Sequence, residues 1–158
     1  MNMNFLSIIA FSSGAAISIQ AAMNAQLGSL LKNPLLAACA AFSSSIFFTL
    51  LAVMVYTKEY PSIEIVKSIP IYLWFAGGIL SAFAISMFYY LIPQMGIGPM
   101  MSFALTGQLI VAVIASHFGW FNLPIKPLTL VKLVGAIALI VGVVLINTEQ
   151  DIVKFRHK

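Results

Sequence analysis

The side chains best suited to chemistry in this sequence are carboxamides inside apolar segments. Gln20, Asn24 and Gln26 lie within the stretch GAAISIQAAMNAQLG, and Gln108 lies in a later apolar segment. An unpaired polar group in hydrocarbon costs roughly several kcal/mol, so these groups must face protein or a water-filled cavity. Carboxamides hydrogen-bond polar or cationic small molecules without being ionised. The stretch therefore predicts a polar site inside a membrane.

The spacing of these carboxamides selects three of them. Gln20 and Asn24 are four residues apart and share one helix face, whereas Gln26 points elsewhere. Gln20 and Gln108 each lie within about one helical turn of the middle of their segments. Two interpretations stay open. The three carboxamides bind a substrate, or they bond helices together for about 0.6–2 kcal/mol each.

Ionisable groups are nearly absent from the apolar segments. His117 lies near the end of one of them, where it serves either as an interfacial residue in headgroup water or as a proton-sensitive, substrate-contacting residue. All four acidic residues, Glu59, Glu64, Glu149 and Asp151, lie outside the segments. An antiport mechanism based on an embedded carboxylate therefore has no candidate residue.

Five apolar segments long enough to cross a bilayer must position these groups. The fold class is accordingly all-α, a single transmembrane domain over residues 1–158 whose helices form an integral membrane bundle. Asn33 and Pro34 predict an N-cap and a first helical position for the second helix. Ile63 to Ile69 predicts a short amphipathic turn at the interface. The expected spans are 5–30, 34–56, 70–92, 99–121 and 128–146, with a solvent-facing tail and short loops that make sequential helices antiparallel neighbours.

The composition excludes a water-soluble domain. Hydrophobic residues make up 61% of the chain, charged residues only 8%, and the mean hydropathy is +1.04. A net charge of +4 does not indicate nucleic-acid binding, because the basic residues lie in short loops and the tail. The single cysteine, Cys39, is expected to be a small apolar packing residue. The first apolar stretch is expected to be a retained helix rather than a cleaved signal.

The basic residues do not define a membrane orientation. With five spans, one side receives Lys58, Lys67, Lys126 and Lys132, and the other receives Lys32, Lys154, Arg156 and Lys158. This balance reflects either the low charge of the chain or dual topology, in which opposed copies form an antiparallel dimer.

Small residues recur at helical spacing in three of the segments and predict close helix packing. The first helix has Gly14, Ser18 and Ala22, the second has Ala37, Ala41 and Ser45, and the last has Gly135, Ala138 and Gly142. The last helix, otherwise apolar, is the best candidate for a dimer interface.

The sequence gives little support for an enzyme. Ser116 and His117 are adjacent and so point about 100° apart on a helix, which makes a poor nucleophile and base. We expect no metal site and no cofactor, because neither a ligand cluster nor a phosphate-binding glycine loop is present.

Two motifs are familiar. The stretches IQAAMNAQLGSLLKNPLLAACAAFSSS and TGQLIVAVIASHFGWF resemble those of the YdcZ-type family of the drug/metabolite transporter superfamily, and the final span LTLVKLVGAIALIVGVVLI is similar to its last helix. Gln20, Asn24, Gly107, Gln108, His117 and Gly119 match motif positions. The resemblance implies a small transporter of the bacterial inner membrane, acting as a dimer. Ser116 departs from the family pattern, which commonly has Asp there, so any ion coupling through that Asp is in doubt.

Together these observations predict a multi-pass transporter, an exporter of a small polar or cationic metabolite or drug. It would work by alternating access as a homodimer around a polar pocket formed by Gln20, Asn24 and Gln108. Trp74 and Tyr89 are expected to line the ends of the path. The alternative is a non-transporting scaffold or regulatory subunit that partners another transporter, in which Gln20 and Gln108 bond to each other or to backbone.

Overall fold

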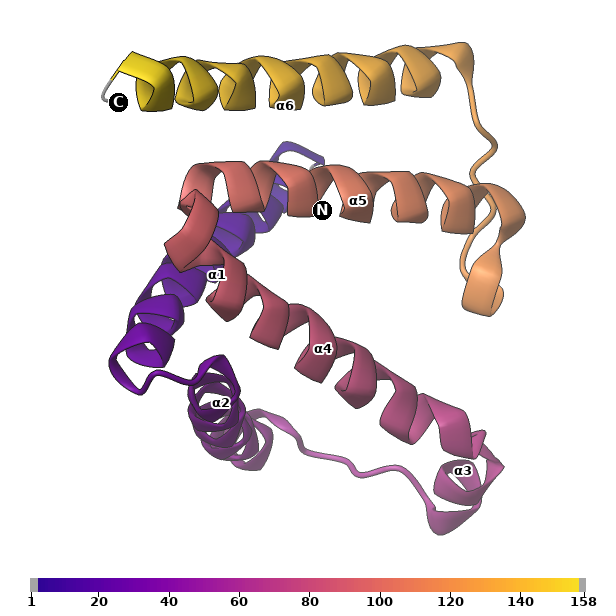
Figure 1. The fold of residues 1–158 in the computed structure, drawn as a ribbon. Coiled ribbons are helices and arrows are strands. Elements are labelled where there is room, and N and C mark those ends of the chain that lie inside the picture. Colours follow the sequence, from indigo (N-terminus) through magenta and orange to yellow (C-terminus); the bar gives the residue numbers. More distant parts are fainter. Residues whose placement is uncertain (1–2, 157–158) are drawn as a thin grey trace. The chain divides into compact units, whose positions relative to one another are not determined.

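The computed structural model describes the backbone of residues 3–156 and the side chains of residues 3–148. It is 86% helical, and the described residues form no strand. Five helices are long and apolar enough to cross a membrane (Figure 1), which confirms the predicted all-α fold. They are α1 (Met3–Leu30), α2 (Pro34–Tyr56), α4 (Ile71–Met95), α5 (Ile97–Phe118) and α6 (Leu130–Arg156).

The chain forms two compact units that divide between Gln94 and Met95. The first contains α1, α2, the short helix α3 (Ile63–Ser68) and α4, and the second contains α5, the 3-10 turn η1 (Trp120–Asn122) and α6. In each unit one helix pair is in contact, α1 with α2 and α5 with α6. The predicted packing of sequential neighbours thus holds for these pairs. It is wrong for α2 and α4, which an open groove separates.

The turn between α1 and α2 follows the sequence closely. The Asn33 Oδ1 atom accepts hydrogen bonds from the backbone N–H groups of Leu35 at 2.9 Å and Leu36 at 3.4 Å, and Pro34 occupies the first turn, which confirms the predicted cap. Lys32 closes α1 in a left-handed conformation, with φ of 53°. The Asn33 N–H then bonds the Gly28 carbonyl at 2.9 Å, as in a Schellman motif.

Small residues form the interface within this hairpin. Ala21, Ala25 and Gly28 are the buried residues of α1, and the buried residues of α2 are Ala37, Ala38 and Ala41. A Cβ atom at Gly28 would lie 3.3 Å from the Pro34 Cα atom. The stripe predicted for α2 is thus confirmed at Ala37 and Ala41.

The row of small residues predicted on α1, Gly14, Ser18 and Ala22, is not the row that packs against α2. A Cβ atom at Gly14 would meet nothing within 4 Å, and Ser18 and Ala22 are only half-buried. The residues that pack instead start at Ala21, because the two helices are closest beside the tight turn that joins them.

The break between α4 and α5 is much shorter than expected. Residues 93–98 were predicted as a loop, but α4 continues through Pro93 to Met95 and α5 begins at Ile97. A proline in the last turn removes only one N–H and does not end the helix at once. Gly96, with φ of 86°, is the residue that turns the chain.

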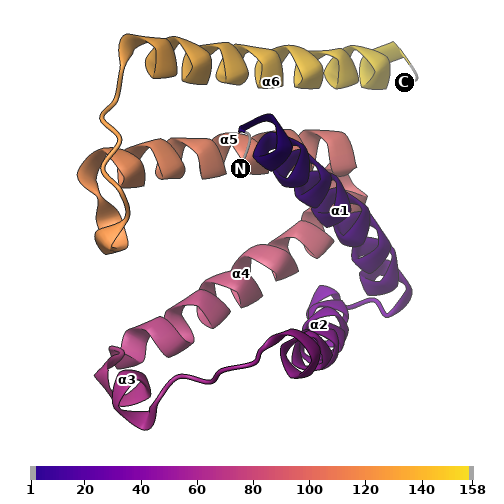
Figure 2. The same ribbon diagram turned by 180° about the vertical axis from the view of Figure 1, so that it is seen from behind.

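The ends of α5 and α6 also differ from the prediction. α5 stops at Phe118 rather than Phe121, because Gly119 adopts a left-handed conformation with φ of 63°. α6 begins at Leu130 and extends beyond Ile146 to Arg156. Figure 2 draws it as one continuous helix, coloured from orange to yellow. The predicted exposure of the tail side chains after Thr148 lies outside the described residues.

Large apolar side chains point outward from the helices, while the buried residues are mostly small. Phe11 is 80% exposed and Phe75 is 62% exposed, for example. The expected interfacial turn is α3, on which Ile63 and Ile65 are exposed. Such surfaces are solvated by hydrocarbon in a membrane protein rather than by water.

Candidate functional site

The most deeply buried polar side chain of the first unit is Tyr89, in the last third of α4. It is 1% exposed, and its hydroxyl has no hydrogen-bond partner among the described residues. The half-buried Asn24 side chain of α1 approaches this hydroxyl, although the two groups do not reach regular hydrogen-bond geometry. Ser86, one turn earlier on the same face of α4, is 3% exposed. Asn24, Ser86 and Tyr89 therefore form a small polar cluster between two apolar helices.

The other predicted residues of the first unit lie outside this cluster. Gln20 is one turn from Asn24 on α1, but its side chain is exposed, as is that of Gln26 on a different face. Trp74 is 53% exposed near the start of α4, about 22 Å along the helix axis from Tyr89 at 1.5 Å per residue. The structure thus brings Asn24 and Tyr89 together. Gln20 lies at the edge of this cluster, and Trp74 lies near the opposite end of α4 from Tyr89.

Gln108 and His117 belong to the second unit. Gln108 is exposed halfway along α5, and His117 lies in its last turn. The His117 Nδ1 atom accepts a hydrogen bond of 3.1 Å from the Leu128 backbone N–H. His117 therefore fastens the connection between α5 and α6 to the end of α5, a role that the sequence did not indicate.

Two more contacts hold the same connection. The Lys126 N–H donates to the Ser116 carbonyl at 2.8 Å, and the Lys132 Nζ atom donates to the Pro127 carbonyl at 2.9 Å. The Ser116 hydroxyl donates to the Ala112 carbonyl and not to His117. A serine–histidine nucleophile is thus not assembled at this position.

One polar residue of the second unit was not predicted. The Asn147 Nδ2 atom of α6 donates to the Ser102 hydroxyl of α5 at 3.2 Å and to the Val143 carbonyl, while its Oδ1 atom is buried without a partner. The predicted span ended at Ile146, the residue before Asn147, whereas α6 continues to Arg156. The argument applied to Gln20 would have found Asn147 if the helix had been extended by a single turn.

The chemistry available at these sites is hydrogen bonding by neutral groups. No carboxylate lies within the helices between residues 3 and 148 apart from Glu64 on the short helix α3, and the side chains described there include no cluster of histidine, cysteine or acidic residues able to hold a metal ion. The arrangement suits recognition of a polar molecule, since hydroxyl and carboxamide groups both donate and accept.

Comparison with known proteins identifies the family. Residues 5–145, most of the chain, match the model of a family described as "Putative inner membrane exporter, YdcZ". No curated protein and no solved structure matches the chain. The resemblance of the two sequence motifs is thereby confirmed. The chain belongs to this family of membrane exporters and is a multi-pass protein of the inner membrane.

Proposed function

We propose that this member of the YdcZ family exports a small polar or cationic metabolite or drug, using the Asn24–Tyr89 cluster to bind it. The family assignment supports transport in general. Beyond transport itself, we propose the class of substrate, the residues that bind it and the dimeric mechanism. We also propose that the two compact units act as one transmembrane domain.

The observation that supports the site best is the unpartnered hydroxyl of Tyr89. A buried polar group without a hydrogen bond destabilises a protein by about 1–3 kcal/mol. Water or a ligand from outside the chain can complete such a group, and here Asn24 adds a second donor and acceptor beside it. We infer that a substrate hydroxyl, amine or carbonyl, or the water that it displaces, bonds to both side chains.

The remaining predicted residues would complete the path. Gln20 continues the polar face of α1 beyond Asn24, and Gln108 offers a second carboxamide at the middle of α5. Trp74 would line the opposite end of the path from Tyr89. His117 would contact substrate only through its Nε2 atom, because its Nδ1 atom is already an acceptor for Leu128.

We further propose that two copies assemble through α6. Cβ atoms at Gly135 and Gly142 would meet nothing within 4 Å, so this side of α6 is open to close approach by another helix. The residue of α6 buried in the second unit, Val143, lies about 100° around the helix from Gly142. Opposed copies would account for the even division of basic residues, and rocking of one copy against the other would give alternating access.

A scaffold or regulatory subunit is the second candidate, favoured by the absence of a carboxylate from the long helices between residues 3 and 148. In that function Gln20 and Gln108 bond to each other or to backbone and no substrate enters. The test below separates the two functions.

Purified protein in lipid nanodiscs is screened against metabolites and drugs by thermal shift, and each hit is repeated with Gln20→Ala, Gln108→Ala and Asn24→Ala. The matched control is Gln26→Ala, which removes an exposed carboxamide from another face of α1. We expect a hit whose shift is lost in the three site variants and kept in the control. A hit that survives all three site substitutions unchanged contradicts the proposed pocket, and no hit at all favours the scaffold.

A further inference from the structure

We propose that the groove between α2 and α4 is a second ligand site, which binds an uncharged amphiphile with an apolar body and a hydrogen-bonding group. The site goes beyond the proposed export function and does not depend on it. Ser81 lies eight residues before Tyr89 on α4, or about 12 Å along the helix axis.

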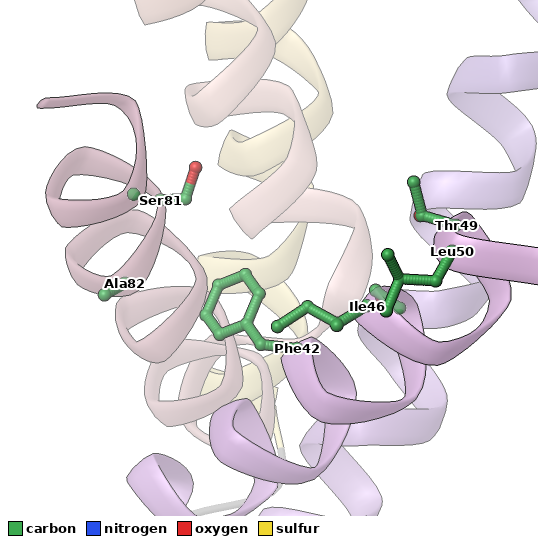
Figure 3. Close-up of a pocket in the computed structure, with 8 residues that line it drawn as sticks. Phe42, Ile46, Thr49, Leu50, Ser81 and Ala82 are labelled. Carbon is green, nitrogen blue, oxygen red and sulfur yellow. The ribbon is translucent and has the colours of Figure 1, made fainter. Parts of the chain in front are cut away.

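The groove has the size of a small-molecule site. Its volume is about 550 Å³, and sites for small ligands commonly measure 300–1,000 Å³. Its lining residues come from α2 and α4: Phe42, Ser45, Ile46, Thr49, Leu50, Gly78, Ser81 and Ala82. Figure 3 labels six of them, with Phe42 and Ile46 on α2 and Ser81 and Ala82 on α4.

The hydroxyl groups of the groove are free, unlike most others in the helices. Ser18 and Thr106, for example, donate back to carbonyls of their own helix, at 3.1 Å and 2.8 Å. Within the described residues the hydroxyls of Ser45, Thr49 and Ser81 make no hydrogen bond, and both walls contribute to this set. A ligand with a hydroxyl, carbonyl or amine offers these groups a partner, whereas a lipid acyl chain offers none and would leave them to bond carbonyls of their own helices.

The ligand of such a groove is uncharged. No acidic or basic side chain lines the groove, so an ion would lose its hydration without gaining a counter-charge. The ring of Phe42 and the side chain of Ile46 provide the apolar contact surface.

The depth of the groove indicates how the ligand arrives. Ser45 is the central residue of α2, Pro34–Tyr56, and Ala82 lies within one residue of the centre of α4, Ile71–Met95. A groove at the middle of a span opens toward hydrocarbon, so the ligand first partitions into the bilayer and then enters sideways.

Photolabelling with a diazirine derivative of octanol tests this site directly, because the probe combines an alkyl chain with one hydroxyl. The protein is labelled in lipid nanodiscs, unlabelled octanol is added as competitor, and labelled residues are located by peptide mass spectrometry. We expect saturable labelling concentrated in residues 42–50 and 78–82. Thr49→Val and Ser81→Ala should each weaken competition by octanol about three- to tenfold, the effect of one lost hydrogen bond.

Two further variants serve as the matched control and as a groove that is filled by a side chain. Ser44→Ala is the matched control, because the Ser44 hydroxyl already donates to the Ala41 carbonyl at 2.9 Å and does not line the groove. Gly78→Leu fills the groove, since a Cβ atom at Gly78 meets nothing within 4 Å. We expect Ser44→Ala to label like the unaltered protein and Gly78→Leu to lose labelling while eluting unchanged in gel filtration.

Two outcomes overturn the site. Labelling spread evenly over all lipid-facing helices and not competed by octanol would mean that no site exists. Labelling confined to the groove and lost in Gly78→Leu, but unchanged when the hydroxyls are removed, would assign the groove to an acyl chain of the surrounding lipid. Neither result bears on the Asn24–Tyr89 cluster, whose variants are tested separately.

Discussion

Two buried polar atoms of residues 3–148 lack a hydrogen-bond partner, and the proposed substrate site is built around one of them. The Tyr89 hydroxyl and the Asn147 Oδ1 atom are both buried and unpaired among the described residues. Composition alone pointed to Asn24, because a carboxamide in the middle of an apolar segment is costly. The nearness of Tyr89 to Asn24 could not be predicted, since it depends on how α4 lies beside α1. Asn147 was missed because its helix was predicted to end at Ile146 and continues to Arg156.

The hydrogen bond at His117 leads to a prediction at the same scale. The imidazole accepts the Leu128 N–H at Nδ1, and an alanine side chain offers no acceptor there. In His117→Ala we expect the hydrogen-exchange protection of the Leu128 amide to fall by about 3- to 10-fold, the value of one hydrogen bond.

Transport measurements then separate this positioning role from proton coupling. Flux driven by a pH gradient is measured in proteoliposomes for the unaltered protein and for His117→Ala. An unchanged gradient dependence eliminates His117 as a coupling residue, and loss of the dependence with binding preserved would assign it that role.

At the scale of the helices, local chemistry predicted some ends and not others. Asn33 followed by Pro34 is a strong start signal, and α2 begins there. Pro93 and Pro99 misled the prediction, because a proline within the last or first turn is compatible with a helix. The true breaks are at Gly96 and Gly119, whose positive φ angles sequence composition does not reveal.

The α1·α2 hairpin gives a sharp prediction about packing. Gly28→Val would place new atoms 3.3 Å from the Pro34 Cα atom and 3.4 Å from the Ala37 Cβ atom. Because the Pro34 Cα atom belongs to the backbone and Ala37 is fully buried, neither can easily move away, and we expect a loss of stability of about 1–3 kcal/mol. Gly14→Val is the matched control on the same helix, where a Cβ atom meets nothing within 4 Å.

Thermal or denaturant unfolding in a single detergent compares the two variants. Both substitutions replace glycine by the same β-branched residue, so differences in helix propensity cancel. Equal stability of Gly28→Val and Gly14→Val would mean that the small-residue interface does not hold the two helices together.

At the scale of the whole molecule, the division of charge bears on how the chain inserts. The five spans place four basic residues on each side of the membrane, so the distribution of Lys and Arg favours neither orientation. We expect reporter fusions at the N-terminus and at the C-terminus each to be detected on both sides of the membrane in comparable amounts.

Shifting the charge balance should shift the orientation. Lys58→Gln together with Lys67→Gln leaves two basic residues on one side against four on the other, and we expect most copies to place the four on the cytoplasmic side. A single fixed orientation of the unaltered protein would exclude the antiparallel dimer.

The most direct test of the proposed site is a paired measurement of stability and flux on Tyr89→Phe. The hydroxyl has no partner within the described chain, so its removal should leave the free energy of unfolding unchanged or raise it by about 1 kcal/mol. Flux of the substrate identified by the ligand screen, measured in proteoliposomes, should fall at least tenfold. Tyr90→Phe, which alters an exposed neighbour, should change neither quantity. Full flux in Tyr89→Phe would contradict the account, and so would a large loss of stability, because it would show that the hydroxyl is bonded within the protein.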